Sequence, residues 1–451
     1  MHRRSFLTLA GAGVGALALG ACSGPAVGGT TAPSDSASTN AGPDFTGVTA
    51  ATSIDFWSSN PGDSQAVTQQ IIDEFTKQTG ISVNIVSASS YEDVAQKFQA
   101  AQAAGGAGLP ALITLSDVWW FRFFLNDQII PLENALKAAE VDTADYLEVF
   151  FADYQYDGGQ WAVPWARSTP LFYYNKKHWA DAGLSETDPF TWEQFAEDYA
   201  PKLTEVNGGK PAYQWGSIAG YAGWVGQNLL WGWGGGWSAQ NSFDLTVTSD
   251  ATKKALQFME DSIYGSTPWA GQSANDSGAD MVALAASATI ESAGSFAGIK
   301  KSLQSAGNPF ELGAFPLPGG PAATTKVCPT GGTGVAIPAG IDPAQQLAAA
   351  KFIAFLTTPE NTVTFSEATG YVPIRKSADV SSLDPITQVA VKQASETRSQ
   401  DWARVYLPGA DQEMNNMIQT LMTSKADVDT AASTLQDTLQ KIYDSQVKPN
   451  L

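Results

Sequence analysis

Arg3, Arg4 and Cys22 are the first residues of this chain whose types and spacing indicate a specific chemistry. The twin arginine precedes an uncharged run over 6–21, which ends in Leu-Gly-Ala-Cys at 19–22. Such a start is typical of an export signal, and twin arginines indicate the Tat route. The last four residues match the bacterial lipobox, in which the cysteine is acylated after cleavage. We therefore predict a signal peptide over 1–21 and a lipid on Cys22; cleavage nearby without lipidation is the alternative.

Side chains that carry much of enzyme chemistry are scarce in this sequence. The chain has two histidines and two cysteines, and His178 and Cys328 are those outside the predicted signal and lipid site. A single histidine excludes His-rich zinc sites and leaves a Ser/His/Asp triad resting on one residue. The glycine-rich runs at 208–210 and 232–236 lack the Lys-Ser/Thr that completes a phosphate-binding loop. We expect no metal, no cofactor and no catalytic activity.

Charge and aromatic content narrow the class of partner. The formal net charge is −20, so the surface repels nucleic acid and anionic membranes. The chain also has 14 tryptophans, whose ring faces suit polyols, C–H surfaces and cations. Most should lie in the core, but five stand beside Gly and Asn in predicted loops: Trp215, Trp224, Trp231, Trp233 and Trp237.

Alternating strands and helices must position the functional groups of the first part of the chain. Residues 53–57, 81–86 and 112–115 have strand patterns, and segments with one apolar helical face lie between them. This order is the unit of a doubly wound α/β sheet, in which ligands bind beyond the carboxyl ends of the strands. Asp117 directly follows the third strand. It caps the next helix, contacts a ligand, or does both.

The rest of the sequence gives the domain organisation. Residues 162–175 form an extended, crossing segment, and Thr358 and Gly370 bound a helix that begins with Pro359. Residues 23–52 contain almost no large apolar side chain and predict a disordered tether. The predicted units are the signal peptide 1–21, the lipidated Cys22 with its tether over 22–52, and one domain over 53–451.

Three segments of the chain resemble the family-1 extracellular solute-binding proteins, the receptors of ABC importers. They are Thr-Pro-Leu-Phe-Tyr-Tyr-Asn-Lys at 169–176, Ala-Gly-Leu at 182–184, and the stretch 351–373. The resemblance implies an α/β, two-lobed periplasmic-binding-protein-like fold. Each lobe would be a doubly wound sheet with helices on both faces, with the ligand in the interlobe cleft and hinge closure on binding.

The resemblance also implies lobe boundaries and partners. It places the first lobe at about 53–163 and 315–365, and the second at about 164–314 and 366–451. The partners would be a small-molecule solute and the transmembrane permease subunits of an ABC importer, and the protein would be a monomer. The protein would be extracytoplasmic, tethered by its lipid to the outer face of the cell membrane.

Within that family, four further motifs resemble the glycerol-3-phosphate and glycerophosphodiester receptors of the UgpB type. They are Trp-Ala-Arg-Ser-Thr-Pro at 165–170, Ser-Ala-Gly-Ser at 292–295, Thr-Gly-Gly at 330–332 and Gly-Tyr-Val-Pro at 370–373. Residues 400–409 resemble the mycobacterial branch, which takes glycerophosphocholine. The resemblance implies nine ligand-contacting positions: Tyr91, Asp117, Ser168, Tyr221, Trp224, Ser292, Gly332, Tyr371 and Arg404.

The chemistry of these residue types agrees with a zwitterionic phosphodiester. The Arg404 guanidinium could make a bidentate contact with phosphate, and the serine and tyrosine hydroxyls and the Gly332 N–H are further donors. An ionised Asp117 would accept hydrogen bonds from glycerol hydroxyls. The rings of Trp224, Tyr221 and Tyr91 could enclose a choline ammonium.

Alternatives stay open for each of these residues and for the function. Arg404 could pair with Asp401 or Glu396 on a surface helix, the serines could bond local backbone, and Gly331-Gly332 could be a plain turn. A receptor for a neutral oligosaccharide would use the same fold. A tethered glycosidase would need two facing carboxylates, of which the sequence suggests Asp117 alone.

Overall fold

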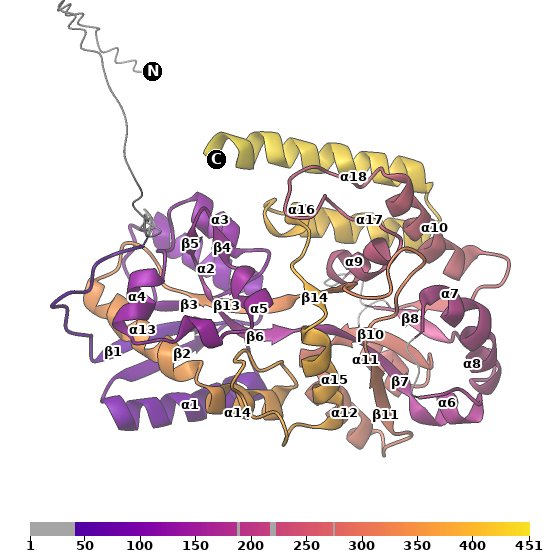
Figure 1. Ribbon diagram of the computed structural model, residues 1–451, viewed down its shortest axis with the longest axis horizontal. Coiled ribbons are helices and arrows are strands. Elements are labelled where there is room, and N and C mark those ends of the chain that lie inside the picture. The colour runs from indigo at the N-terminus through magenta and orange to yellow at the C-terminus, as the bar shows by residue number, and fades with distance from the viewer. Residues whose placement is uncertain (1–40, 187–189, 217–221, 274–275) are drawn as a thin grey trace, which may run out of the picture. The chain divides into compact units, whose positions relative to one another are not determined.

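The computed structural model describes residues 41–186, 190–216, 222–273 and 276–451 (Figure 1). The predicted signal peptide, Cys22 and Tyr221 lie outside these ranges. Within them, no helix is long and apolar enough to cross a membrane. Residues 41–51 differ from the predicted tether because they pack on the domain: Phe45 is buried, and the Ala51 N–H donates to the Ala344 carbonyl at 2.8 Å.

The first sheet contains the predicted strand–helix–strand–helix–strand unit. Its order along the chain is β1 (Ser53–Ser58), α1 (Asp63–Thr79), β2 (Ser82–Ser87), α2 (Tyr91–Ala103) and β3 (Leu112–Ser116). β1 pairs in parallel with β2 and with β3. Two further strands, β13 (Gly331–Ala336) and β6 (Val163–Ser168), extend the sheet to the order β2-β1-β3-β13-β6. β13 is antiparallel to both of its neighbours, β3 and β6.

The helix α1 forms where the sequence predicts it because its apolar residues share one face. Val67, Ile71, Ile72 and Phe75 are buried, and Gly80 ends the helix in the left-handed conformation at φ 75°. A glycine adopts this conformation without the steric cost of a side chain. This face of α1 therefore packs into the core beside β2.

The second sheet also mixes parallel and antiparallel pairs. Its order is β11-β7-β10-β8-β9; β8 pairs in parallel with β9 and β10, whereas β7 is antiparallel to both of its neighbours, β10 and β11. These strands are β7 (Pro170–Asn175), β8 (Tyr213–Trp215), β9 (Ala270–Gln272), β10 (Ala288–Ser292) and β11 (Leu312–Phe315). The two mixed sheets flanked by helices confirm the predicted α/β fold class.

The chain passes between the sheets at Thr169. β6 ends at Ser168 in the first sheet, and β7 begins at Pro170 in the second. Sheet membership therefore assigns 163–168 to the first lobe, whereas the sequence expectation began the second lobe at 164. The bridge between Arg167 and Val372 ties this crossing to a second one later in the chain.

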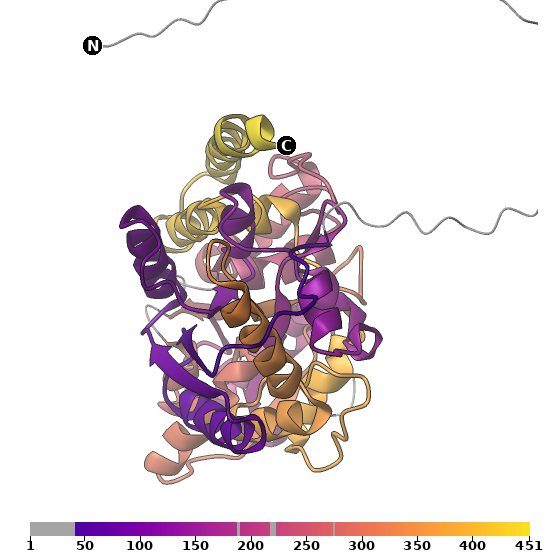
Figure 2. The same cartoon turned by 90° about the vertical axis from the view of Figure 1, so that its left-hand side faces the viewer.

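Helices cover both sheets, and the C-terminal pair α17 and α18 lies together at the top of Figures 1 and 2. The short strands are β4 (Gln155–Tyr156), β5 (Gly159–Gln160), β12 (Cys328–Pro329) and β14 (Thr397–Arg398). The remaining helices are α3 (Trp120–Leu125), α4 (Glu133–Ala138), α5 (Glu148–Ala152), α6 (Lys176–Asp181), α7 (Trp192–Gln194), α8 (Ala200–Val206), α9 (Ala222–Gly232), α10 (Asp250–Tyr264), α11 (Ser277–Val282), α12 (Phe296–Ser305), α13 (Pro343–Leu356), α14 (Pro359–Thr369), α15 (Pro385–Ala394), α16 (Trp402–Val405), α17 (Ala410–Ser424) and α18 (Val428–Ile442).

The expectation that a group of tryptophans lies in loops is wrong for three of them. Trp215 is in β8, and Trp224 and Trp231 are on α9, where every residue is buried. Most side chains of α9 are apolar, as is typical of a helix inside a core. Its glycines suggested loops, but two of them allow close packing: a Cβ at Gly223 or Gly226 would lie about 3 Å from α17 side chains.

Candidate functional site

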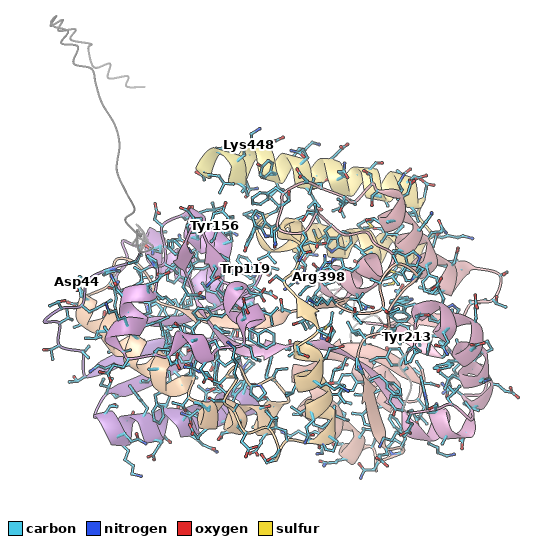
Figure 3. The ribbon with its side chains drawn as sticks, in the orientation of Figure 1. Asp44, Trp119, Tyr156, Tyr213, Arg398 and Lys448 are labelled. Atoms are coloured by element: carbon cyan, nitrogen blue, oxygen red, sulfur yellow. The ribbon has the colours of Figure 1, made fainter. Side chains whose placement is uncertain are left out.

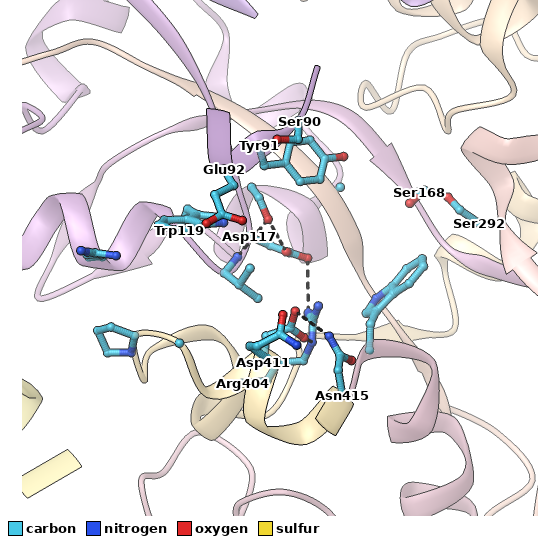
Figure 4. A pocket seen from close by; sticks show the side chains of 18 of the residues that line it. Ser90, Tyr91, Glu92, Asp117, Trp119, Ser168, Ser292, Arg404, Asp411 and Asn415 are labelled. Carbon is cyan, nitrogen blue, oxygen red and sulfur yellow. Dashed lines mark hydrogen bonds and ion pairs between the residues drawn. The ribbon is translucent and has the colours of Figure 1, made fainter. Parts of the chain in front are cut away.

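A cavity of about 560 Å³ opens where β3 of the first sheet and β10 of the second sheet end. Residues from both sheets and from the C-terminal helices line it (Figure 4). Eight of the nine predicted contact positions are among the lining residues, and the ninth, Tyr221, lies outside the described residues: Tyr91, Asp117, Ser168, Trp224, Ser292, Gly332, Tyr371 and Arg404. The structure therefore brings together residues that are far apart in the sequence.

Asp117 lies at the edge of the first sheet and faces the C-terminal segment. The helix-capping alternative is wrong, because α3 begins after Trp119 and has no side-chain cap. The Asp117 N–H donates to the Gly332 carbonyl at 3.1 Å, which fixes the backbone where β3 ends. Its carboxylate accepts a hydrogen bond from Gln400 Nε2 and lies 3.9 Å from Arg404 Nη1.

Arg404 is buried at the base of the cavity and not on a surface helix. Its Nε donates to Asp411 at 2.7 Å, and Nη1 donates to Gln400 Oε1. Among the described residues, Nη2 has no hydrogen-bond acceptor. Burial raises the pKa of Asp411, and the Arg404 charge opposes that shift. The alternative pairing with Asp401 is wrong, because Asp401 accepts from Arg398 instead.

Two adjacent glycines shape the wall between Trp224 and the crossing strand. Gly332 has φ 109°, and a Cβ there would lie 2.2 Å from the Ala166 carbonyl oxygen. A Cβ at Gly331 would lie 2.3 Å from the Trp224 ring, whose Nε1 donates to the Thr330 carbonyl at 2.7 Å. The glycines thus form a bulged strand, not a plain turn, and let the indole lie directly on it.

The hydroxyl-bearing residues come from different elements. Ser168 ends β6 and Ser292 ends β10. Ser292 Oγ also accepts the Gly294 N–H at 3.1 Å, so this serine bonds local backbone as well as lining the cavity. Tyr371 follows α14 and stacks on Phe365. Burial raises the pKa of Tyr371, while a hydrogen bond with the Tyr91 side chain opposes the shift.

Sequence reasoning missed several lining residues and one residue behind them. The residue behind the lining is Gln400. It lies within the motif at 400–409, but an amide carries no charge that would mark it as functional. Those missed on the lining are Ser90, Glu92, Ser116, Val118, Trp119, Arg122, Gly294, Ser295, Leu407, Pro408, Gly409, Asp411, Gln412 and Asn415. One of these lining residues, Trp119, is labelled near the middle of Figure 3.

The charged lining is slightly acidic and offers no metal site. Its acidic side chains are Glu92, Asp117 and Asp411, and its basic side chains are Arg122 and Arg404. Asp117 and Asp411 both lie beside Arg404 and do not stand as an isolated pair of facing carboxylates. Within the described ranges, no group of three or more His, Cys, Asp or Glu side chains could hold a metal ion.

Glu291 lies behind the second-sheet side of the cavity. It directly precedes Ser292, accepts a hydrogen bond from Ser277, and lies 3.5 Å from Oγ of Ser295, which lines the cavity. Burial raises its pKa from an ordinary 4.5 to about 7, against the effect of those hydrogen bonds. The folded protein thus holds this proton more tightly than the unfolded chain does.

We expect Glu291→Gln to stabilise the protein at about pH 8 by roughly 1–3 kcal/mol. Because the pKa is raised in the folded state, the wild type loses stability as the pH rises from about 4.5 to about 7. Glutamine resembles the protonated acid and removes this loss. Urea unfolding across this range measures the effect, with the exposed Glu311→Gln as control. A variant with the wild-type pH dependence would contradict the prediction.

The chain matches known proteins over most of its length. The family model described as bacterial extracellular solute-binding protein matches residues 70–394. The sn-glycerol-3-phosphate-binding periplasmic protein UgpB of Pectobacterium atrosepticum is 28% identical over 347 residues, covering 74% of this chain and 75% of that protein. UgpB of Escherichia coli K12 is 26% identical over 344 residues, covering 73% and 76%.

Solved structures give the same assignment. UgpB from Mycobacterium tuberculosis in complex with glycerophosphocholine is 39% identical, with a TM-score of 0.80 over 88% of this chain and 100% of that one. The GacH receptor of Streptomyces glaucescens, solved unliganded and with acarbose, has 20% identity, a TM-score of 0.74, and coverage of 87% and 98%. At that identity, the likeness to GacH concerns the fold alone.

These matches decide the general role of the protein. Proteins of this kind bind a small molecule outside the cytoplasm and deliver it to the permease subunits of an ABC importer, without catalysing a reaction. The two mixed sheets and the cavity between their strand ends suit that role. Since the family model spans residues 70–394, this chain belongs to the bacterial extracellular solute-binding proteins.

Proposed function

We propose that this protein is the substrate-binding lipoprotein of an ABC importer and captures a glycerophosphodiester for uptake. Glycerophosphocholine is the first choice of ligand and glycerol-3-phosphate the second. The observation that carries the proposal is the convergence of Arg404 with the Ser168, Ser292 and Tyr371 hydroxyls and the Gly332 backbone in one cavity. Its volume of about 560 Å³ is ordinary for a small ligand.

The charges of the lining support the choice of a zwitterion. Three acidic and two basic side chains line the cavity, so a second negative charge on the ligand would meet a repulsive field. Glycerophosphocholine brings one negative and one positive charge, whereas glycerol-3-phosphate approaches a dianion near neutral pH. The acidic lining therefore favours the choline ester.

A receptor for a neutral oligosaccharide is the alternative on the same fold. Trp224, Trp119 and Asp117 would suit a sugar. Burial of Arg404 at the base of the cavity supports the phosphodiester instead, because a neutral sugar does not need a buried cation. A tethered glycosidase is a distant third reading, disfavoured because Arg404 contacts both nearby carboxylates.

The test is calorimetric titration of the purified domain with glycerophosphocholine, glycerol-3-phosphate, maltose and trehalose. We expect glycerophosphocholine to bind about thirtyfold more tightly than glycerol-3-phosphate, which corresponds to roughly 2 kcal/mol of cation–π contact. Binding of maltose or trehalose without binding of glycerophosphocholine would overturn the proposal in favour of the sugar receptor.

Trp224→Leu is expected to lose glycerophosphocholine selectively. The substitution keeps apolar bulk on α9 but removes the ring that can contact a choline ammonium, so the preference over glycerol-3-phosphate should fall by about tenfold or more. Trp119→Leu, which also changes an indole on the lining, is the control. Equal losses for both ligands in Trp224→Leu would mean that the indole contacts the shared glycerophosphate part.

The lipid anchor rests on the sequence at 19–22. We expect Cys22→Ser to move the protein from the membrane fraction to the soluble fraction, because the serine hydroxyl cannot carry the lipid thioether. Fractionation of cells that express either form measures the change. Full membrane retention of the variant would exclude anchoring through Cys22.

A further inference from the structure

Gln400 connects the two sides of the cavity through its amide. The side chain is buried, and its Nε2 donates to Asp117 Oδ2 on the first-sheet side. Its Oε1 accepts from Arg404 Nη1 and, at 3.1 Å, from Gln227 Nε2 on α9. Gln227 in turn accepts the backbone N–H of Asp401 at 2.9 Å, which holds the Gln400 segment in place. Both ends of the amide are therefore used.

The orientation of this amide matches the charges at either end. Its donor faces the Asp117 carboxylate and its acceptor faces the Arg404 guanidinium. Asp117 and Arg404 approach each other only to 3.9 Å, whereas Arg404 Nε lies at 2.7 Å from Asp411. A direct bidentate pair between Asp117 and Arg404 would use the atoms that each could offer to a ligand. The neutral amide of Gln400 instead bonds one atom on each side, Oδ2 of Asp117 and Nη1 of Arg404.

We propose that Gln400 is a positioning residue for ligand binding: a neutral bridge that keeps Asp117 and Arg404 from closing into a direct ion pair. Asp117 then presents an oxygen to ligand hydroxyls, and Arg404 presents Nη2 to the phosphate. The proposal deepens the glycerophosphodiester function and rests on it. Gln400 itself lies behind the cavity lining and acts through the two residues that it holds.

The proposal requires that the side chain at position 400 be uncharged, and not only that it have the shape of glutamine. Glutamate has the same shape, but when ionised it pairs with Arg404 and repels Asp117. When protonated, it donates an O–H to Asp117 and accepts from Arg404, as glutamine does. The charged groups facing this position are Asp117 and Arg404, with Asp411 beyond Arg404 and the Asp401–Arg398 pair beside it. The buried Asp153–Arg167 pair is also close, because Asp153 bonds the side chain of Ser399 and both charges of the pair act on Asp117.

The experiment is a titration of Gln400→Glu with glycerophosphocholine between about pH 5 and pH 8. We expect affinity at least about tenfold below that of the wild type at the upper end, and a return to within about threefold as the new carboxyl takes up a proton. Recovery in acid is a result that a packing defect would not give. A loss of affinity that is the same at every pH, or no loss, would overturn the proposal.

Two further variants control this experiment. Gln419→Glu adds a carboxylate on the exposed face of α17, outside the cavity lining, so its affinity should follow the wild-type pH profile. Gln400→Met keeps the length but removes the polar bridge, and should bind about tenfold more weakly at every pH. Wild-type affinity in Gln400→Met would overturn the bridge, and this variant gives that answer even if Gln400→Glu fails to fold.

Failure of this inference can be told apart from failure of the proposed function. If the wild type does not bind glycerophosphocholine, the proposed function is wrong. If the wild type binds it and Gln400→Glu binds equally well across the pH range, the ligand assignment holds and the bridge is wrong.

Discussion

Replacing Arg404 with alanine is expected to weaken glycerophosphocholine binding by about thirtyfold to several thousandfold, or roughly 2–5 kcal/mol. The protein has a net charge of −20, so a bound phosphate needs a local cation to overcome the general repulsion. Arg404 is buried and held by Asp411 and Gln400 at the base of the cavity. Truncation removes the donors to phosphate and leaves Asp117 and Asp411 without the cation that lies beside both.

Calorimetric titration of wild type and Arg404→Ala measures this loss, and thermal unfolding checks that the variant is folded. The matched control is Arg122→Ala. Arg122 lines the same cavity but lies over the Trp119 ring, 5.5 Å from its centre, outside the buried Arg404 cluster. Its loss should stay within about threefold, as for a charge at the rim. An Arg404→Ala affinity within about a factor of two of wild type would refute the phosphate assignment.

Elements marked by local signals could be predicted, both near the start of the chain and at α14. Apolar residues at helical spacing mark α1, Gly80 ends it, and Thr358 and Gly370 bound α14 as expected. The position of β13 between β3 and β6 could not be predicted. Its sequence begins Gly-Gly-Thr-Gly, which has a low β-propensity, and its partners are distant in the chain.

The site was predictable where residue type and strand edges coincide. Asp117 follows a predicted strand, and its place at the sheet edge follows from the α/β pattern. Arg404 was identified through the resemblance alone, because an exposed helix explained its sequence context equally well. Its true partner Asp411 lies in the next helix, so only the packing of α16 against α17 brings them together. Gln400 carries no such signal, since its role depends on two charges that the fold brings to it.

A buried charge pair lies under the crossing strand that carries Ser168. Arg167 is fully buried; Nη1 donates to the Tyr154 hydroxyl at 2.7 Å, and Nη2 pairs with Asp153. Burial raises the pKa of Asp153 to about 6, and the Arg167 charge opposes that shift. Arg167 also accepts the Val372 N–H at its carbonyl, where the two crossing segments meet. The pair therefore lies where the chain passes between the two sheets.

Arg167→Met is expected to lower the free energy of unfolding by about 3–5 kcal/mol, because it leaves the Asp153 carboxylate buried without its cation. Without Arg167 the pKa of Asp153 rises further in the folded state, so the loss should be larger at about pH 8 than at about pH 5. Adding Asp153→Leu removes the unpaired charge and should recover most of the lost stability at the higher pH. Urea unfolding of both variants at the two pH values measures this. Equal losses at both pH values, or a double variant no more stable than the single one, would mean that Arg167 stabilises the crossing through its contacts with the Phe150 and Tyr154 rings and not through its ion pair with Asp153.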